Sequence, residues 1–322
     1  MKRNLSKRTT RALLLALWLS LFSFGLVQAQ VSTARYSGGE SAGLSSKALS
    51  LPQNSSAPVD KELMVYGAKI HYVEAGSGPV VILLHGLGGN TQNWALNSGA
   101  LAAKFRVVAL DQIGFGRSDK PVINYRIGTY VDFLEQFCKQ LKIERASIAG
   151  VSMGGWIAAA FTVAHPERVD RLVLIDAAGY ALPPGFDERK LIDLNPSTRE
   201  GMKQLAATVF YNKQVFTSDA VIDQMMTQRI TAGDGYTIRS ISESIMRRED
   251  SFDNRLSAIK QPTLVIWGRE DGLLPLSDGE RFKKDIAGST LLVFDLCGHV
   301  PNVEKATEFN AAVLRFLTAS PS

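Results

Sequence analysis

A serine between glycines follows an apolar run near the middle of the chain. The pentapeptide Gly150-Val151-Ser152-Met153-Gly154 fits G-x-S-x-G, the pattern of a sharp strand-to-helix turn that presents a nucleophilic serine. The apolar run 146–150 predicts a strand before the serine, and the stretch 153–165 predicts a helix after it. Flanking glycines are needed because side chains would collide with so tight a turn. The pattern therefore predicts Ser152 as a nucleophile.

The same pentapeptide pattern occurs a second time, as Gly39-Glu40-Ser41-Ala42-Gly43. This copy lies in a stretch rich in serine and glycine, with neither a strand before it nor a helix after it. The nucleophile turn needs both elements, so Ser41 is not expected to take part in catalysis.

A serine hydroxyl needs a neighbouring base, and His299 is the histidine best placed to supply one. It lies in Cys297-Gly298-His299-Val300, after the last expected strand and before the last expected helix. Loops at the carboxyl ends of parallel strands meet at one edge of the sheet, where Ser152 is also expected. His299 is therefore the predicted general base.

An acid must orient the histidine, and Asp271 gives the chain order Ser, Asp, His that is typical of this arrangement. Asp271 follows the expected strand 263–267. Glu270 beside it is interpreted as a solvated neighbour. Asp176, at the end of the expected strand 172–176, stays open as a second choice for the acid.

Two backbone N–H groups are expected to form the oxyanion hole. One belongs to Met153, directly after the serine, and the other to Leu87, in the glycine-rich loop that follows the expected strand 80–85. His85 and Gly86 in that loop are predicted to line the substrate site. His71, inside an expected strand, and His165, before a proline, are interpreted as structural.

Other conspicuous residues predict no further chemistry. The segment 111–118 contains two glycines but lacks the third glycine and the lysine of phosphate-binding loops, so it is interpreted as a structural turn. The two cysteines, Cys138 and Cys297, are too few for a disulfide framework. The expected mechanism requires no metal and no cofactor.

Apolar runs and amphipathic stretches alternate along most of the chain, which predicts a mostly parallel sheet with helices on both faces. The strand candidates are Leu63–Tyr66, Lys69–Glu74, Val80–His85, Val107–Asp111, Ala146–Gly150, Leu172–Asp176, Thr263–Trp267 and Thr290–Asp295. Helices are expected over 125–141, 153–165, 277–286 and 303–317.

The alternation stops between residues 178 and 259, where no buried strand is expected. Three amphipathic helices are expected there, the first beginning with the capping box Ser197-Thr198-Arg199-Glu200. The segment is interpreted as a helical cap over the ends of the strands. It contains four methionines, which suit either a lid that adapts to apolar groups or ordinary helix packing: Met202, Met225, Met226 and Met246.

The first residues predict export. A basic head is followed by an apolar run to Val27, and Ala29 offers a cleavage position, which is typical of a signal peptide over 1–29. An uncleaved leader that anchors the chain in a membrane is the alternative. Residues 30–59 are interpreted as a flexible tether.

The charge of the chain gives no reason to expect a polyanionic partner. The net charge is +5, and five basic and no acidic residues precede Gln30, which leaves 5 − 5 = 0 for the remainder. Nucleic-acid binding is therefore not expected.

Four segments together resemble the α/β-hydrolase superfamily, in the family order: His85-Gly86-Leu87, Gly150 to Gly155, Trp267 to Asp271, and Cys297-Gly298-His299. The resemblance covers residues 60 to 318. It implies an eight-stranded α/β sheet with the core at 60–177 and 260–322 and a cap at 178–259. Dehalogenases and epoxide hydrolases of the superfamily carry aspartate at the position of Ser152, which argues against both activities.

Three functions remain open. The first is a serine esterase or lipase, resembling monoacylglycerol lipases in its cap, that acts on a small apolar ester through an acyl-enzyme. The second is a C–C hydrolase that uses the same three residues on a diketone from aromatic-ring cleavage. The third is a ligand receptor without turnover. Oligomeric state is left open.

Overall fold

The computed structural model describes residues 57–252 and 255–320, which contain one eight-stranded sheet. Ser41, the expected leader with its cleavage position at Ala29, and most of the tether lie outside the described residues. The spatial order of the strands is β1-β2-β4-β3-β5-β6-β7-β8. The strands are β1 Val59–Val65, β2 Ala68–Ala75, β3 Val80–Leu84, β4 Arg106–Leu110, β5 Ala146–Val151, β6 Val169–Ile175, β7 Thr263–Gly268 and β8 Thr290–Phe294.

Strands β3 to β8 run parallel, whereas β1 and β2 form an antiparallel hairpin and β2 pairs antiparallel with β4. The central strands β5 and β7 are buried along their whole length, because helices cover both faces of the sheet. Five parallel strands therefore end at the same edge as β3, and the loops that follow them converge there.

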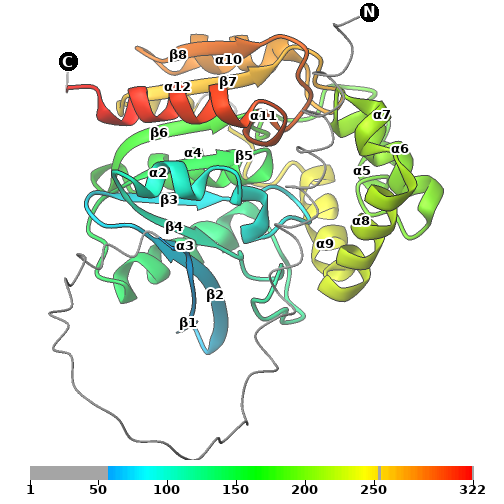
Figure 1. The fold of residues 1–322 in the computed structure, drawn as a ribbon, viewed down its shortest axis with the longest axis horizontal. Coiled ribbons are helices and arrows are strands. Elements are labelled where there is room, and N and C mark those ends of the chain that lie inside the picture. The colour runs from blue at the N-terminus through cyan, green and yellow to red at the C-terminus, as the bar shows by residue number, and fades with distance from the viewer. Residues whose placement is uncertain (1–56, 253–254, 321–322) are drawn as a thin grey trace, which may run out of the picture. The chain divides into compact units, whose positions relative to one another are not determined.

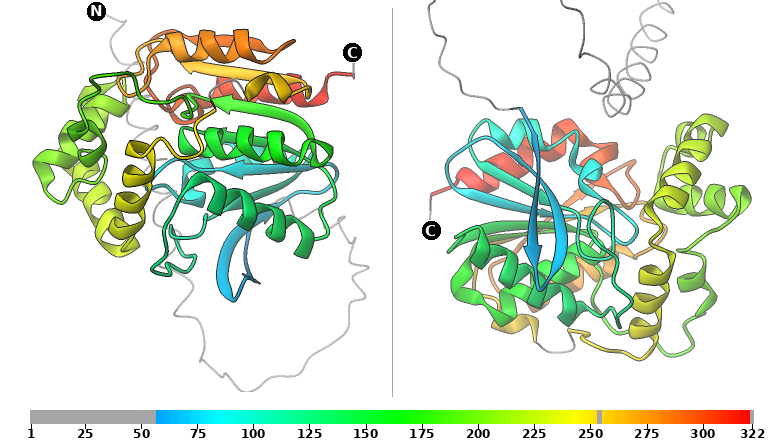
Figure 2. Two further views of the ribbon diagram at one scale, coloured as in Figure 1. Left: turned by 180° about the vertical axis from the view of Figure 1, so that it is seen from behind. Right: turned by 90° about the horizontal axis from the view of Figure 1, so that it is seen from below.

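Helices pack on the two faces in two groups (Figure 2). One group, α3, α4 and α10, contributes Phe137, Phe161 and Phe282 to the larger apolar core. The other group, α2 and α12, contributes Leu101 and Phe309 to the smaller core on the opposite face. The bounds are α2 Ser98–Ala102, α3 Ile127–Gln140, α4 Met153–Ala164, α10 Leu276–Asp285, α11 Pro301–Glu304 and α12 Ala306–Thr318.

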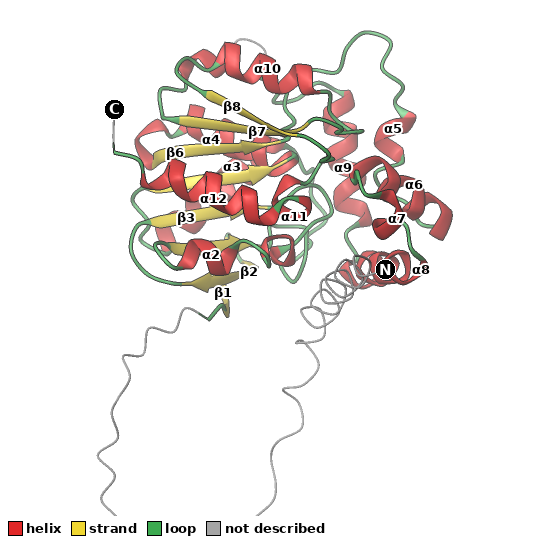
Figure 3. Ribbon diagram, turned by 45° about the horizontal axis from the view of Figure 1, so that its top comes forward, coloured by secondary structure: helices red, strands yellow, loops and turns green. Residues whose placement is uncertain are grey.

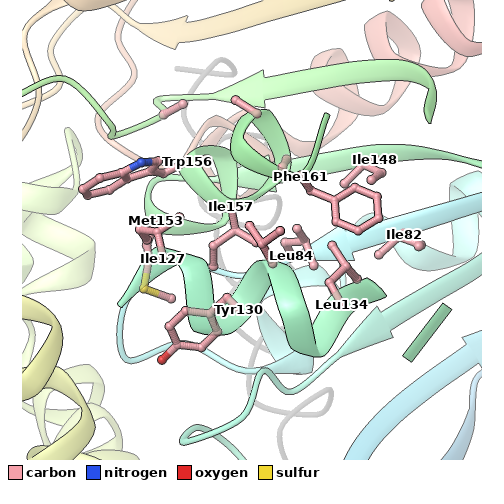
Figure 4. Close-up of a cluster of buried hydrophobic side chains, with 14 of the residues drawn as sticks. Ile82, Leu84, Ile127, Tyr130, Leu134, Ile148, Met153, Trp156, Ile157 and Phe161 are labelled. Atoms are coloured by element: carbon pink, nitrogen blue, oxygen red, sulfur yellow. The ribbon is translucent and has the colours of Figure 1, made fainter. Parts of the chain in front are cut away.

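The larger core fixes α4, the helix that begins directly after Ser152. Figure 4 shows Met153 and Ile157 of α4 beside Tyr130 of α3 and Leu84 of β3. These four side chains are at most 4 % exposed. Burying apolar side chains of this size contributes about 1.5–3 kcal/mol each, so the start of α4 is held firmly against the sheet.

Five helices between β6 and β7 gather at the end of the sheet where the parallel strands terminate (Figures 1 and 3). They are α5 Arg189–Ile192, α6 Arg199–Val209, α7 Lys213–Phe216, α8 Asp219–Ala232 and α9 Gly235–Met246. The insertion after the sixth strand is thus all-helical, as expected. Met202, Met225 and Met226 pack with Ile222 in a small cluster between α6 and α8, which favours the helix-packing interpretation of the methionines.

The expected capping box at the start of α6 is wrong by one residue. The N-cap is Thr198, whose hydroxyl accepts a hydrogen bond from the Gly201 N–H at 3.1 Å. Glu200 then falls one position too early to close the box, and its carboxylate accepts instead from the amide of Gln204.

Other departures from the expected elements are local. The helix expected over 303–317 is divided into α11 and α12 at Lys305, whose backbone is not helical. The short helix α2 and three 3₁₀ turns, Thr91–Trp94, Pro166–Arg168 and Leu256–Ala258, were not expected. Among the described residues, no helix combines the length and apolarity that crossing a membrane requires.

Candidate functional site

Ser152 occupies a strained turn between β5 and α4. Its φ of 56° and ψ of −120° are unusual for a residue with a side chain. The backbone is held by its neighbours: the Ser152 N–H donates to the Ile175 carbonyl at 2.9 Å, and the Ser152 carbonyl accepts from Trp156 and Ala178, each at 3.1 Å. These bonds hold Ser152 at the end of β5, directly before the first residue of α4.

Glycines around the turn are required by close backbone contacts. A Cβ on Gly150 would lie 2.2 Å from the Gly154 carbonyl oxygen, and a Cβ on Gly154 would lie 2.2 Å from the Leu84 carbonyl oxygen. Neither distance is possible between real atoms, so the helix could not begin at its present place with larger residues.

The loop after β3 lies beside the serine. A Cβ on Gly86 would lie 3.2 Å from the Ser152 Cβ and 3.8 Å from its Oγ, so this loop borders the hydroxyl. The Leu87 N–H donates no hydrogen bond to any described residue. Met153 is the first residue of α4, where an N–H has no partner within the helix. Both N–H groups expected to form the oxyanion hole are thus available.

His85 supports this loop from within the core, which corrects the expectation that it lines the substrate site. Its side chain is fully buried; Nδ1 donates to the Gly86 carbonyl at 2.7 Å, and Nε2 accepts from the Gln112 N–H at 3.1 Å. Burial lowers the pKa of His85, consistent with a neutral ring that both donates and accepts. Gly86, by contrast, borders the serine, and its predicted role in lining the substrate site stays a prediction.

His299 and Asp271 are joined by a hydrogen bond of 2.7 Å between Nδ1 and Oδ2. The histidine side chain is 5 % exposed and the aspartate side chain is not exposed at all. The other carboxylate oxygen of Asp271, Oδ1, accepts from the N–H groups of Leu273 and Leu274 at 2.8 and 3.1 Å. The carboxylate is therefore fixed by three donors and leaves Nε2 of the ring facing away from it.

The alternative acids make no hydrogen bond to the ring of His299 in the described residues. Asp176 makes no hydrogen bond to His299; its Oδ1 accepts from the Gly268 N–H at 2.9 Å. Burial, followed by the charge of Asp271, raises the pKa of Asp176 well above its usual range. Glu270 is exposed and accepts from the Cys297 N–H at 2.9 Å, so it braces the loop before His299.

Glu304 is a residue of the site that the sequence did not reveal. Its Oε1 accepts from the Gly298 N–H at 2.8 Å, and its Oε2 accepts from the Tyr211 and Asn212 N–H groups at 3.0 and 3.3 Å. The His299 N–H also donates to the carbonyl of Val209, the last residue of α6, at 2.7 Å. The histidine loop is thus hydrogen-bonded directly to the cap, and only the position of Glu304 five residues after His299 hinted at a link.

A cap arginine also reaches the loop that borders Ser152. A Cβ on Gly88 would lie 2.6 Å from Nη2 of Arg229, so the guanidinium lies against this glycine. Nη1 of Arg229 donates to Asp234, which is buried, at 3.0 Å. No sequence pattern predicts this contact, because it joins α8 to a loop more than a hundred residues earlier.

The segment 111–118, expected to be a structural turn, is held by hydrogen bonds to Asp111. Asp111 is buried and accepts from the N–H groups of Thr91 and Arg117 at 2.6 and 2.8 Å and from His71 Nδ1 at 2.7 Å. His71 is accordingly structural, as expected. Cys138 and Cys297 are both buried free thiols.

One set of side chains in the described residues has the spacing of metal ligands: Asp176, Asp271 and His299, with one donor atom of each within 4.8 Å of the others. Most of these atoms already take part in hydrogen bonds within the protein. The arrangement as a whole places a serine on one loop, a histidine on another and an acid behind the histidine, at the ends of β5, β8 and β7. Such a set can carry out nucleophilic acyl transfer.

Comparison with known proteins agrees with the fold. A sequence-family model described as alpha/beta hydrolase fold matches residues 79–306. The 2-hydroxymuconate semialdehyde hydrolase of Pseudomonas sp. (strain CF600) is 31 % identical over 277 residues, covering 84 % of this chain and 97 % of that protein.

Two solved structures are also similar. A meta-cleavage product hydrolase from Pseudomonas fluorescens IP01 has 30 % identity and a TM-score of 0.74, covering 80 % of this chain and 97 % of that one. A bacterial membrane phospholipase A has 30 % identity and a TM-score of 0.71, covering 81 % and 86 %. With its matched residues spanning most of the sheet and the cap, the chain belongs to the α/β-hydrolase fold family.

Proposed function

We propose that this protein is a serine hydrolase that cleaves carboxylic esters through an acyl-enzyme. Ser152 attacks the ester carbonyl while His299 Nε2 accepts its proton, and His299 then protonates the departing alcohol. Water, activated by the same nitrogen, releases the acid. Asp271 holds the tautomer with the proton on Nδ1, and the N–H groups of Leu87 and Met153 stabilise the oxyanion.

The observation that carries this proposal is the 2.7 Å bond between His299 Nδ1 and Asp271 Oδ2, at the same sheet edge as the strained turn of Ser152. Because Nδ1 is bonded to the acid, Nε2 is the ring nitrogen left to accept a proton. The strained φ of Ser152 is tolerated where a side chain must be presented to a substrate.

Activity on a panel of p-nitrophenyl esters of graded chain length tests the proposal. We expect hydrolysis by the wild type and none by Ser152→Ala, with a fluorophosphonate probe labelling only the former. Ser41→Ala is the matched control, because Ser41 occupies the second G-x-S-x-G pattern, and this variant is expected to retain full activity. Undiminished ester hydrolysis by Ser152→Ala would remove Ser152 from the mechanism.

A second candidate is C–C bond hydrolysis of a diketone carboxylate by the same residues. It is favoured by relatives such as the 2-hydroxymuconate semialdehyde hydrolase, and by the contact of Arg229 with Gly88, two residues after the Gly86 that borders the serine. A guanidinium there would attract a substrate that carries a carboxylate. Turnover of a dienoate with no ester hydrolysis would select this function.

Arg229→Gln separates the two candidates. For a carboxylate-bearing substrate we expect the KM to rise about tenfold, whereas the KM for a neutral ester should change little. Arg239→Gln, on the neighbouring helix α9, is the matched control, since no ion pair of Arg239 is present in the described part of the chain.

We further propose that residues 1–29 direct export, with cleavage after Ala29. The basic head and apolar run support this, and the alternative of a retained leader would associate the protein with a membrane. The N-terminal sequence of the protein recovered from the secreting cell, together with its partition between soluble and membrane fractions, distinguishes the two.

A further inference from the structure

A second carboxyl group lies behind the proposed triad acid, and acyl transfer does not use it. Asp176 follows β6, is fully buried, and has a φ of 41°. Its Oδ1 accepts from the Gly268 N–H, but its Oδ2 has no hydrogen-bond partner among the described residues. Buried polar atoms are nearly always hydrogen-bonded, so this oxygen requires an explanation.

The group that faces Asp176 is Asp271. One side-chain atom each of Asp176, Asp271 and His299 lie within 4.8 Å of one another. Two ionised carboxylates are both acceptors and cannot hydrogen-bond to each other. If one of them carries a proton, it becomes a donor, and the otherwise unpaired oxygen gains a partner.

The hydrogen bonds decide which carboxyl carries the proton. Asp271 accepts from three donors: the N–H groups of Leu273 and Leu274, and His299 Nδ1. Asp176 accepts from one donor, Gly268. Donors stabilise the ionised form, so Asp271 is the carboxylate and Asp176 the acid.

The surrounding charges act in the same direction. Burial and the negative charge of Asp271 raise the pKa of Asp176, Glu304 on α11 raises it further, and only the Gly268 N–H lowers it. Cys297, on the loop after β8, is a buried thiol that faces the same cluster. His299 is the remaining titratable group there, and it is bonded to Asp271.

We propose that Asp176 is a positioning residue: a neutral carboxylic acid whose O–H donates a hydrogen bond to the Asp271 carboxylate and fixes that carboxylate against His299. The proposal rests on the triad of the proposed function. A neutral donor supports the charge of Asp271 without adding a second negative charge beside the histidine.

Two other roles for Asp176 fit the contacts less well. A reserve acid would need to reach His299 Nδ1, which Asp271 already occupies. A bound cation would need several oxygen ligands, and among the described residues Asp176 Oδ2 is the one carboxylate oxygen of the pair without a hydrogen-bond donor.

Replacing Asp176 with Asn and with Leu tests the proposal. The amide of Asp176→Asn can accept from Gly268 and donate to Asp271, as the neutral acid does, whereas Asp176→Leu can do neither. We expect kcat/KM to fall about 10- to 100-fold in Asp176→Leu, with Asn rescuing most of that loss. A fall in Asp176→Asn as large as in Asp176→Leu would show that a negative charge is needed and would overturn the proposal.

Infrared difference spectra supply a readout that a merely structural role would not change. The wild type at neutral pH should show the C=O stretch of a protonated carboxyl, which Asp176→Asn removes and the surface variant Asp295→Asn leaves in place. Absence of this band from the wild type would contradict the proposal. This spectrum needs no substrate, so it remains decisive even if the wild type fails to react with the fluorophosphonate probe and the proposed function falls.

Two further measurements address the other roles. If Asp176 were a reserve acid, the double variant Asp271→Asn, Asp176→Asn would be clearly less active than Asp271→Asn alone; our proposal expects the two to be equal. If a cation were held here, a chelator would remove activity from the wild type; our proposal expects no effect.

Discussion

Ser152 is the proposed nucleophile, and its backbone conformation costs free energy. A residue with a side chain at φ 56° costs about 1–3 kcal/mol relative to a relaxed backbone, and the neighbouring hydrogen bonds to Ile175, Trp156 and Ala178 must offset it. Stability and activity are therefore in conflict at this residue.

Replacing Ser152 with Gly separates the two effects. Glycine adopts positive φ without strain, so we expect Ser152→Gly to unfold at higher urea concentration than Ser152→Ala, by about 1 kcal/mol in the free energy of unfolding. Both variants should lack hydrolytic activity. Equal stability of the two variants would mean that the turn is not strained.

Sequence patterns predict some residues of the candidate site and not others. The sequence predicts Ser152, Asp271 and His299 as site residues because each lies in a short local pattern after an apolar strand, and the structure places all three after parallel strands at one edge of the sheet. The sequence does not predict the contact of Glu304 with the cap or that of Asp176 with Gly268, since these partners come from segments far away in the chain. His85 was placed wrongly because its pattern fits both a substrate contact and a buried support for the loop.

At the scale of elements, the site depends on how closely α4 approaches β3. The absent side chain of Gly154 allows this approach, because its Cα lies against the carbonyl groups of Leu84 and His85. The packing that buries Met153 and Ile157 thus also fixes the position of Ser152, which directly precedes α4, relative to the end of the sheet.

Adding one methyl group tests this dependence. We expect Gly154→Ala to lower the free energy of unfolding by about 1–3 kcal/mol, as overpacking does, and to reduce labelling of Ser152. Gly99→Ala in α2 is the matched control: nothing lies within 4 Å of its Cβ position, and alanine favours a helix. Urea unfolding of both variants measures the difference, and similar losses in the two would contradict the packing argument.

Glu304 links two elements, the histidine loop and the cap. We expect Glu304→Ala to lower kcat about tenfold or more, because the N–H groups of Gly298, Tyr211 and Asn212 lose a charged acceptor. Glu308→Ala, one turn further along on α12, should leave kcat unchanged. Hydrogen exchange at Tyr211 and Asn212 reports on the same link, and unaltered protection there in Glu304→Ala would refute it.

The elements themselves were largely predictable. Buried parallel strands such as β5 and β7 are continuous apolar runs, and the helix found at Met153–Ala164 was expected over 153–165. Strand β1 begins four residues earlier than expected because Asp60, Lys61 and Glu62 are exposed at the sheet edge, where no apolar pattern is required. The five-residue helix α2 is too short for a periodic signal.

At the scale of the whole molecule, Asp111 joins the β1–β2 hairpin to loops at the edge where the parallel strands end. Burial raises its pKa, but the hydrogen bonds from His71, Arg117 and Thr91 outweigh burial, so the net pKa is lowered. A carboxyl whose folded-state pKa is depressed contributes stability above its unfolded pKa, and that contribution disappears as the pH falls through the folded value.

Acid unfolding tests this role. We expect Asp111→Asn to be about 3 kcal/mol less stable than the wild type at neutral pH, because His71 loses its charged partner. The difference should shrink as the pH falls below the ordinary pKa of aspartate, where the wild type also loses the charge. Thermal unfolding from neutral pH to pH 3 measures this difference. The control is Asp119→Asn, because the carboxylate of Asp119 accepts from the backbone N–H of Lys69 at the surface. A difference that does not depend on pH would exclude ionisation of Asp111 as the cause.

The hydrogen bond between the His299 N–H and the Val209 carbonyl has a consequence for the order in which the protein becomes active. Ser152 and His299 are 299 − 152 = 147 residues apart, and the whole cap is inserted between them. During refolding, the sheet could close before the cap docks, but the histidine loop would then lack this anchor. We therefore expect native tryptophan fluorescence to recover before Ser152 becomes reactive. The rate of labelling by the fluorophosphonate probe would then report the docking of the cap, the last step of folding.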